Sequence, residues 1–492
     1  MKKLIIFLMA ASLLHCHPVL NGRPVHLAME DDIITLDPFL HDDSITHSVL
    51  SNIYDALVSF DPEMQIVPAL AISWENRDER TWRFYLRPGV KFHDGRKLTA
   101  GDVKFSLERA AKAKVGHYLS AVSRISIIDE TTLEILTDKP YPLLLNKLSF
   151  ISIIPESSPE PVTSPVGTGA YRFQSYVPGG DLLLAANPDY WRGTPAIKKA
   201  VIVAIPDDSA RCQALFDGRI QIIRDVGERY LNVLKASPEL EYLSRPGLGV
   251  TFLGINFKAG GPLASRKVRQ AIYLALDPLM LIRESQAEAE PTDQMVTPYI
   301  VGYLPRFSPQ RPHLQKALGL MKEAGYPAGF SVDLEMSRTA ALRSGPHIAR
   351  QLGRLGINVN TRAYDWQEMM ERLNNGSSPF FLVGWSNSSG DASDFNDACL
   401  HTKVKGSYGN ANWGGYSNRE LDRLIEQSQS VIDSKARMSM LQQIQLKALE
   451  DLPYIPLYVR HRTYGVNRRI SFHPRQDGRI RFFDMEYSQN NH

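Results

Sequence analysis

Hydrophobic and polar positions change period repeatedly along the chain, which separates it into short strand-like and helix-like blocks. Blocks rich in β-branched and aromatic residues, bounded by Gly, Pro or Asp, predict strands at residues 81–86, 132–136, 199–205 and 251–257. Helix signals predict helices at residues 102–112, 266–276, 314–324 and 420–430. This irregular alternation predicts a mixed α/β protein.

Several boundaries can be read from the same pattern. Gly325 follows the third helix where a C-cap glycine is expected, and a long helix with Met440 on its apolar side precedes Pro453. The stretch 155–165 is rich in Pro and Ser and predicts a crossing loop. Residues 457–459 predict a strand that returns to an earlier part of the fold.

The first residues have the pattern of an export signal. Lys2 and Lys3 precede an apolar run from residue 4 to 14, too short to span a bilayer. We expect residues 1–16 to be a signal peptide. Cys16 stands where a lipoprotein carries its lipidated cysteine, but His15 replaces the small residue expected before it. Lipidation of Cys16 therefore stays open, and no later segment predicts a membrane span.

Length and charge narrow the class of protein. A chain of 492 residues predicts two or three domains. Lys plus Arg number 56 against 53 Asp plus Glu, a balance that argues against nucleic acid as a partner. Cys212 and Cys399 lie far apart in the sequence, and we expect two buried free thiols.

Motifs for catalysis and metal binding are missing from the sequence. There is no G-x-S-x-G, H-E-x-x-H or C-x-x-C pattern, and we expect neither a cofactor nor a resident metal. Ser386, Ser388 and Ser389 have no neighbouring base. His93 and the run Gly167-Thr168-Gly169 are interpreted as turn residues.

A binding role is indicated where a predicted strand meets a polar loop. Residues 380–385 form a buried strand pattern that ends in Trp385, and the polar loop 386–394 follows directly. Ligand sites often form where loops leave the end of a sheet. Trp385 is thus a candidate either for ligand contact or for the core.

Residues 71–107, AISWENRDERTWRFYLRPGVKFHDGRKLTAGDVKFSL, resemble the signature of the extracellular solute-binding proteins of family 5, which serve peptide and nickel ABC importers. The signature reads as a strand, a tight turn at Asp94-Gly95 and a helix capped near Thr99. Further similarities follow in the family's order: residues 165–171 (PVGTGAY, with Ala170 for the usual Pro), 187–191 (NPDYW), 206–207, Asn256, 268–272, 320–327, 418–422 and 453–456.

The resemblance implies an α/β fold of two lobes joined by a two-strand hinge, with ligand bound in the cleft. It predicts lobe I at residues 24–50, 164–250 and 463–492, an extra subdomain at 51–163, and lobe II at 256–462. It implies a monomeric, non-enzymatic substrate-binding subunit that delivers peptides to ABC permease subunits. We expect it in the periplasm or on the outer face of the inner membrane.

Ligand residues are carried over by position. In peptide-binding members an aspartate shortly after a Gly-Trp pair holds the peptide ammonium; here that place falls on Ser388, and Asp391 is the substitute. The arginine that clamps the peptide carboxylate falls near Arg343, with Arg338 as the alternative, unless both are solvated surface residues. The other candidates are Trp385, Ser386, Tyr408 and Trp413.

Three alternatives to an ordinary peptide remain. The pattern around Ser388 looks closer to the glutathione-binding branch, whose ligand carries its ammonium on a γ-linked residue. A nickel or metallophore receptor would place histidines along the cleft. An exported hydrolase would need a base beside Ser386, Ser388 or Ser389.

Overall fold

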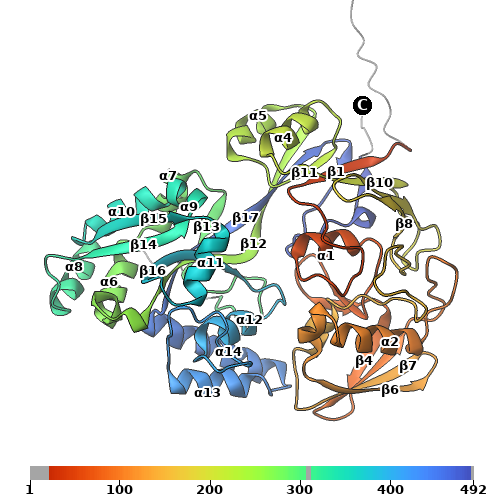
Figure 1. The fold of residues 1–492 in the computed structure, drawn as a ribbon, viewed down its shortest axis with the longest axis horizontal. Coiled ribbons are helices and arrows are strands. Elements are labelled where there is room, and N and C mark those ends of the chain that lie inside the picture. The colour runs from red at the N-terminus through yellow and green to blue at the C-terminus, as the bar shows by residue number, and fades with distance from the viewer. Residues whose placement is uncertain (1–21, 306–311, 489–492) are drawn as a thin grey trace, which may run out of the picture.

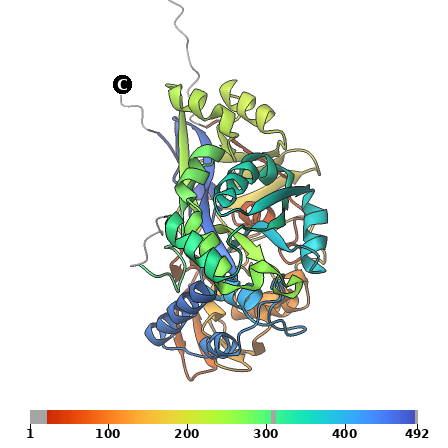
Figure 2. The ribbon, with the colours of Figure 1, turned by 90° about the vertical axis from the view of Figure 1, so that its left-hand side faces the viewer.

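The computed structural model describes residues 22–305 and 312–488, which form two lobes (Figure 1). Two long strands, β12 (Leu240–Ile255) and β17 (Tyr454–Asn467), connect the lobes and pair with each other in antiparallel fashion. Figure 2 shows these strands running side by side along the molecule. Through them one sheet extends across both lobes, in the order β15-β14-β16-β12-β17-β11-β1-β10-β9-β8.

The crossing between the lobes coincides with a break in the pairing. Residues 464–466 of β17 pair with β11 (Ile222–Arg224) in the first lobe, and residues 249–255 of β12 pair with β16 (Phe380–Ser386) in the second. The β12–β17 register shifts between Pro246 and Val250, between these two paired segments. A bulge bends and twists a strand, so the chain changes direction where it leaves one lobe for the other.

The first lobe is a twisted sheet with short covering helices. β1 (Val25–Met29) lies between β10 and β11 and is parallel to both. Its apolar side chains pack into a core that continues into the neighbouring subdomain. The remaining elements of this lobe are β8 (Tyr171–Tyr176), β9 (Leu182–Ala186), β10 (Lys199–Ala204), α1 (Ser44–Leu50), α4 (Asp208–Phe216), α5 (Leu231–Ala236), β18 (Ile470–Ser471) and β19 (Glu486–Tyr487).

A four-stranded antiparallel sheet, in the order β4-β5-β7-β6, forms the body of the subdomain below the first lobe in Figure 1. Alternate residues of β5 (Thr81–Leu86) are buried, as the period-two pattern predicts. Thr99 caps α2 (Ala100–Ala111) in a reciprocal capping box with Asp102. The other elements are β2 (Val58–Phe60), β3 (Ile66–Pro68), β4 (Ala71–Asn76), β6 (Val122–Asp129), β7 (Thr132–Thr137) and α3 (Leu144–Leu148).

The second lobe places helices around β14, β15 and β16. The first four residues of β16 are buried, which matches the continuous apolar run in the sequence. Its elements are α6 (Arg266–Ala275), α7 (Pro278–Ser285), β13 (Ala289–Pro291), α8 (Leu314–Glu323), β14 (Ser331–Ser337), α9 (Arg338–Arg343), α10 (Gly345–Gly353), β15 (Asn358–Tyr364), α11 (Trp366–Asn374), α12 (Ser393–Phe395), α13 (Arg419–Ser428) and α14 (Ser434–Asp451).

Two sequence motifs meet in the first lobe. His93, in the turn of the signature, contacts the Gly167-Thr168-Gly169 turn: its Nε2 lies 2.9 Å from the Gly169 carbonyl, and its Nδ1 accepts from the Gly167 amide at 3.2 Å. Burial lowers the pKa of His93 to about 4, so the imidazole is neutral. A Cβ on Gly167 or Gly169 would lie 2.0 or 2.5 Å from the Ile53 carbonyl oxygen, so only glycine fits.

Most predicted elements lie where the sequence placed them, but one strand was wrong in extent. The segment predicted at 251–257 begins at residue 240 and ends at 255, because the Asn256 side chain accepts from the amides of Lys258 and Ala259 and starts a 3₁₀ turn.

Cys212 and Cys399 are buried and free, as predicted. The predicted signal and Cys16 lie outside the described residues. Among the described residues, no helix has the length and apolar composition that crossing a membrane requires.

Candidate functional site

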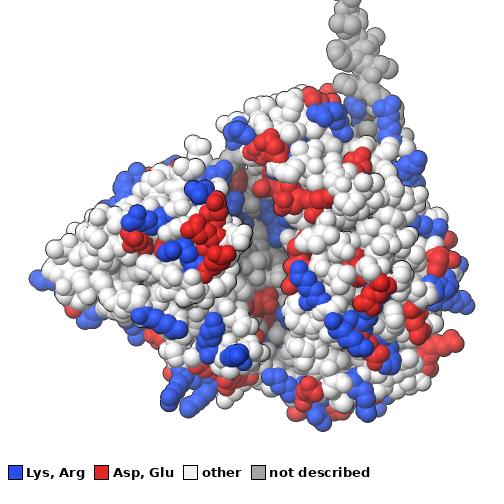
Figure 3. All heavy atoms as spheres, in the orientation of Figure 1, with Lys and Arg blue, Asp and Glu red and all other residues white. Residues whose placement is uncertain are grey.

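The groove between the lobes is deep, and both lobes and the hinge strands line it (Figure 3). Its middle holds a cavity of about 420 Å³, here called the central cavity, bounded by Glu30, Arg224, Asp225 and residues 247–251, 384–386 and 460–463. A second cavity of about 320 Å³, the loop cavity, shares Leu248, Ser386 and Arg462 with it. A third of about 520 Å³, the outer cavity, shares Asp225 and residues 460, 461 and 463.

Trp385 and Ser386 form the second-lobe wall of the central cavity. β16 leaves the core of its lobe at this point, since Phe380–Val383 are buried and Gly384 is exposed. The Trp385 ring packs edge-on against Trp413, with 6.3 Å between centroids. Its indole Nε1 is buried and has no hydrogen-bond partner among the described residues. Because buried donors are almost always paired in proteins, this N–H is a candidate donor to a ligand.

Two hydrogen bonds of Asn387 fix the loop after β16. The Asn387 amide donates to the Leu248 carbonyl at 3.2 Å, and its Nδ2 donates to the Met295 carbonyl at 3.0 Å. Asn387 is buried while Ser386 and Ser388 on either side of it are exposed. Both serines line the loop cavity, opposite first-lobe residues that include His41 and Arg479. The structure therefore brings Trp385, Ser386 and Ser388 together at the cleft, as the sequence suggested.

The opposite wall of the central cavity carries the charge. Arg224, at the end of β11, pairs with Glu30 at 3.1 Å, while one of its terminal nitrogens and the second Glu30 oxygen have no partner in the described structure. Arg462, on hinge strand β17, lines both the central and the loop cavity. Burial lowers the pKa of Arg462, and Arg224 lowers it further.

No hydrogen bond or ion pair of the Arg462 side chain exists among the described residues, although it lies near Glu30 and Asp477. A half-buried guanidinium is costly to leave without a hydrogen-bonded anion once the cleft closes over it. Guanidinium groups bind carboxylates through two parallel N–H···O bonds. Arg462 is therefore the best-placed group in the cleft for an anionic end of a ligand.

Asp225 provides the matching negative charge. It follows β11 with φ 59°, the left-handed region that few residues other than glycine adopt. Its backbone is fixed there by the Thr463 carbonyl, which accepts from its amide at 2.9 Å, and by Arg211, which donates to its carbonyl at 3.0 Å. Its carboxylate lines the central and outer cavities and accepts no hydrogen bond among the described residues.

The two candidate arginines of the second lobe differ. Arg343 lines the outer cavity, together with Trp366 and Glu288. Arg338 forms an exposed ion pair with Asp365 at 2.6 Å, which is the surface role that the sequence left open. The structure thus keeps Arg343, but not Arg338, as a residue of the cleft.

Asp391 has a role other than the ammonium ligand suggested by its position. It is 1% exposed, and its two oxygens accept from Arg437 at 2.5 and 2.9 Å. Burial raises the pKa of Asp391, but Arg437 outweighs this effect and the net pKa lies below the usual value of an aspartate. This carboxylate therefore holds the cleft loop to α14 inside the second lobe, and its charge is already neutralised.

Tyr408 and Trp413 lie outside the cavities, in the second lobe. Tyr408 stacks on His401 with 4.1 Å between ring centroids, and Trp413 donates from Nε1 to Asn374 at 3.0 Å. Neither lines the three cavities. Of the two, only Trp413 touches a cleft residue, Trp385.

One end of the cleft is bridged by contacts between the subdomain and the second lobe. Lys147 forms an ion pair with Asp394 at 3.2 Å, and the Asn146 side chain donates to the Ser389 carbonyl at 2.7 Å. The same loop that carries Ser386 and Ser388 therefore already contacts the other side of the molecule. Movement of the lobes would change these contacts directly.

Comparison with known proteins agrees with this architecture. Residues 65–407 match the family described as bacterial extracellular solute-binding proteins, family 5 middle. The chain belongs to this family. Family 5 proteins are extracytoplasmic substrate-binding components of ABC importers rather than enzymes, and they share the two-lobed fold.

Individual family 5 relatives bind different solutes. The chain is 27% identical to heme-binding protein A of Haemophilus influenzae over 82% of its own length and 81% of the relative's. It is 26% identical to the glutathione-binding protein GsiB of Pectobacterium atrosepticum over 96% of each chain. Because these relatives bind different solutes, membership of the family does not determine which ligand this protein binds.

Solved structures share this fold. DppA from Helicobacter pylori in complex with the peptide STSA matches with a TM-score of 0.74 and 25% identity, covering 94% of this chain and 98% of that one. The unliganded open form of the murein tripeptide-binding protein MppA matches with 0.81 at 21% identity, covering 94% and 97%.

Two alternative chemistries receive no support from the geometry of the described residues. None of the hydroxyls of Ser386, Ser388 and Ser389 hydrogen-bonds to a histidine or carboxylate there, so no activated nucleophile is formed. Three histidines, His41, His47 and His461, do lie along the cleft. Yet no group of three His, Cys, Asp or Glu residues in the described ranges is arranged to hold a metal ion.

The sequence missed the charged wall. Arg224, Asp225 and Arg462 come from strands that are separated by more than 200 residues and meet only in the sheet. One signal was present: charged residues at positions 460 and 462 interrupt an otherwise apolar strand. A charge within a buried strand calls for a partner or a ligand.

Proposed function

We propose that the protein captures a zwitterionic, peptide-like solute in the central cavity and delivers it to an ABC permease. The observation that supports this most directly is a pair of opposite charges on one wall of one cavity, Arg462 and Asp225, whose side chains have no hydrogen-bond or ion-pair partner among the described residues. A peptide has both a carboxylate and an ammonium group. The volume of about 420 Å³ lies in the range of small-ligand sites.

Each wall has a separate task in this proposal. Arg462 binds the carboxylate and Asp225 the ammonium, which fixes the direction of the ligand. Trp385 covers the apolar part of the ligand and donates its indole N–H. Closure of the second lobe over the first buries these contacts, and the permease recognises the closed form.

Glutathione is a second candidate because of the charge balance. The central cavity is lined by three arginines, at positions 224, 460 and 462, against two carboxylates, Glu30 and Asp225. A ligand with two carboxylates and one ammonium compensates this surplus, whereas an ordinary dipeptide leaves one cation over. Ser388, in place of the family's aspartate, also agrees with an ammonium held elsewhere.

The test is calorimetry of the purified protein with di- to pentapeptides, glutathione, glutathione disulfide, nickel–histidine and heme. We expect heat with peptides or glutathione and a stronger response from ligands with a free carboxylate than from their amides. Mass spectrometry of molecules that co-purify gives an independent answer. Binding of heme or a nickel complex, with no response to any peptide, would overturn the proposal.

A further inference from the structure

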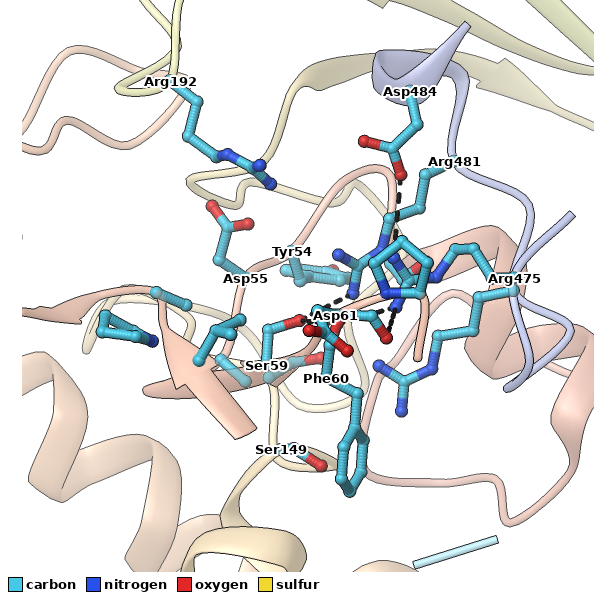
Figure 4. Close-up of a pocket in the computed structure, with 18 of the residues that line it drawn as sticks. Tyr54, Asp55, Ser59, Phe60, Asp61, Ser149, Arg192, Arg475, Arg481 and Asp484 are labelled. Carbon is cyan, nitrogen blue, oxygen red and sulfur yellow. Dashed lines mark hydrogen bonds and ion pairs between the residues drawn. The ribbon is translucent and has the colours of Figure 1, made fainter. Parts of the chain in front are cut away.

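The first lobe contains a cavity of its own, which is separate from the three cavities of the cleft. It measures about 470 Å³ and lies between α1, the β2–β3 hairpin and the C-terminal segment 475–484. Figure 4 shows Arg192 and Asp55 on one side of it and Arg475, Arg481 and Asp484 on the other. We call it the arginine cavity.

A partition divides the arginine cavity from the cleft. His47 and Arg479 line both the arginine cavity and the loop cavity. The Phe150 ring packs against His47, with 5.4 Å between centroids, and the Arg479 guanidinium lies 5.2 Å above the same ring. The two cavities therefore share His47 and the cation Arg479, but the rest of their lining residues differ.

The charge of the lining is unbalanced. The cavity lining contains five arginines but only three aspartates. The arginines are Arg87, Arg192, Arg475, Arg479 and Arg481, and the aspartates are Asp55, Asp61 and Asp484. Each aspartate is already engaged. Asp55 accepts from Trp191 at 2.9 Å and from Thr168 at 3.0 Å, Asp61 accepts from the amides of Glu63 and Gln65, and Asp484 lies 3.9 Å from Arg475.

Arg475 serves as the scaffold of this cluster. It donates to Asp477 from Nε and Nη2 at 3.0 and 2.9 Å, and to the carbonyls of Phe60 and Asp61 at 2.7 and 3.1 Å. These bonds join the C-terminal segment to the subdomain. They also use most of the N–H donors of Arg475, so this residue has little capacity left to bind a ligand.

Arg481 and Arg479 are the cations with donors left over. Arg481 donates to the Ser59 hydroxyl at 3.1 Å, and its buried Nε has no partner within the described chain. The Arg479 side chain is 6% exposed; its one ion pair there is with Asp477, at 3.6 Å, beyond hydrogen-bond distance. Two guanidinium groups thus border one cavity without a hydrogen-bonded anion.

The electrostatics point in the same direction. Burial, together with the neighbouring Arg481 and Arg475, lowers the pKa of Arg479 to about 10 despite the opposing effect of Asp477. Burial and Arg475 also lower the pKa of Arg481. Cations that depress each other's pKa are stabilised by an anion placed between them.

The donors that remain define the kind of anion. Four serines line the cavity in addition to the arginines. Ser51, Ser59 and Ser149 already donate to the carbonyls of Ser48, Phe60 and Asn146, whereas the Ser152 hydroxyl has no hydrogen-bond partner among the described residues. A set of guanidinium and hydroxyl donors suits a tetrahedral oxyanion, which accepts in several directions and binds arginine in a bidentate way. The volume of about 470 Å³ exceeds what a bare phosphate ion fills.

We propose that the arginine cavity binds a small organic phosphate, with its phosphate group between Arg479 and Arg481. This site does not depend on the identity of the solute in the cleft. Because Arg479 also faces the loop cavity, an anion bound here would neutralise a charge on the cleft wall.

The experiment uses the mature protein with inorganic phosphate, glycerol 3-phosphate and a nucleoside monophosphate as probes, and chloride at equal ionic strength as the reference. We expect at least one phosphate probe to raise Tm in a concentration-dependent manner and to give a calorimetric Kd. Arg481→Met should weaken that Kd by at least about tenfold. Arg423→Met, on the exposed surface of α13, is the matched control and should change nothing.

Folding of the variant can be checked independently. Arg481 pairs with no carboxylate in the described parts of the chain, so its replacement by Met should leave Tm without phosphate unchanged. Arg481→Lys should restore part of the binding. Crystals soaked in selenate should show an anomalous peak beside Arg481. A Tm that no phosphate probe raises above chloride, or phosphate binding that survives Arg481→Met, would refute the site; neither result would affect peptide binding in the cleft.

Discussion

The two walls of the cleft are built in opposite ways. The second-lobe wall, Trp385 to Ser388, is continuous in sequence, uncharged and follows a buried strand. The first-lobe and hinge wall gathers Glu30, Arg224, Asp225 and Arg462 from separate strands and carries charges without full pairing. The uncharged second-lobe wall can contact many ligands, whereas the charged wall of the first lobe and hinge selects among them by charge.

The difference also separates stability from binding. On the second-lobe side, both carboxylates of the loop are already paired, Asp391 with Arg437 inside the lobe and Asp394 with Lys147 of the subdomain. On the hinge side, the Arg462 guanidinium has no hydrogen-bonded anion in the described structure. Charge removal should therefore unfold the protein on one side and abolish binding on the other.

The largest effect is expected from Asp391→Asn. Loss of the carboxylate leaves Arg437 buried without a counter-ion, and we expect the free energy of unfolding to fall by about 3–5 kcal/mol. Chemical denaturation measures it. In Asp391→Asn/Arg437→Met both charges are gone, and much of the loss should be recovered.

This prediction also has a pH dependence. Since the pKa of Asp391 in the folded protein lies below its usual value, its stabilisation is complete above about pH 5 and disappears as the pH falls through the lowered pKa. The gap between wild type and Asp391→Asn should close in that acidic range. Normal stability of the single variant at pH 7, with weakened ligand binding, would instead make Asp391 the ammonium ligand.

Arg462→Met should have the largest effect on binding. Removal of a charged donor to the ligand carboxylate costs about 2–3 kcal/mol of binding free energy, so we expect Kd to rise by roughly 30- to 150-fold. Calorimetry measures it against the surface control Arg423→Met. Tm without ligand should not fall, because the removed guanidinium has no hydrogen-bonded partner; an unchanged Kd would place the carboxylate elsewhere, with Arg343 the next candidate.

Replacement of Trp385 separates the area of its ring from its N–H. Trp385→Ala should weaken binding by about 1–2 kcal/mol, through lost apolar contact and the lost donor. Trp385→Phe keeps an aromatic ring but removes the N–H, so its smaller loss reports the indole N–H together with the contact area of the second ring. Equal affinities for wild type and Trp385→Phe would show that the buried Nε1 does not donate to the ligand.

Ser388→Asp should have the smallest effect and the most informative sign. It puts a carboxylate on the uncharged wall, at an exposed position where a solvated ion pair is worth about 0.2–1 kcal/mol. Affinity for α-linked peptides should rise by a few-fold, and affinity for glutathione should not. Ser388→Asn is the neutral control; a gain for glutathione would argue against the charge pattern proposed here.

The sequence was most informative where function depends on local order. The strand at residues 81–86, the Thr99 cap and the emergence of β16 at Trp385 all follow from spacing within a few residues, and all were found in place. Position alone misled at Asp391. Its carboxylate lies near the cleft in sequence, but α14, more than 40 residues later, supplies the arginine that turns it inward.

What the chain determined by itself was its family, its α/β elements and the uncharged wall of the cleft, because these depend on hydrophobic period, turns and capping over short distances. Only the tertiary structure decided which charges remain available. A charge is neutralised or left over according to what lies within a few ångströms of it. For Arg462, Asp225 and Arg481, those neighbours come from distant parts of the chain that the sheet and the C-terminal segment bring together.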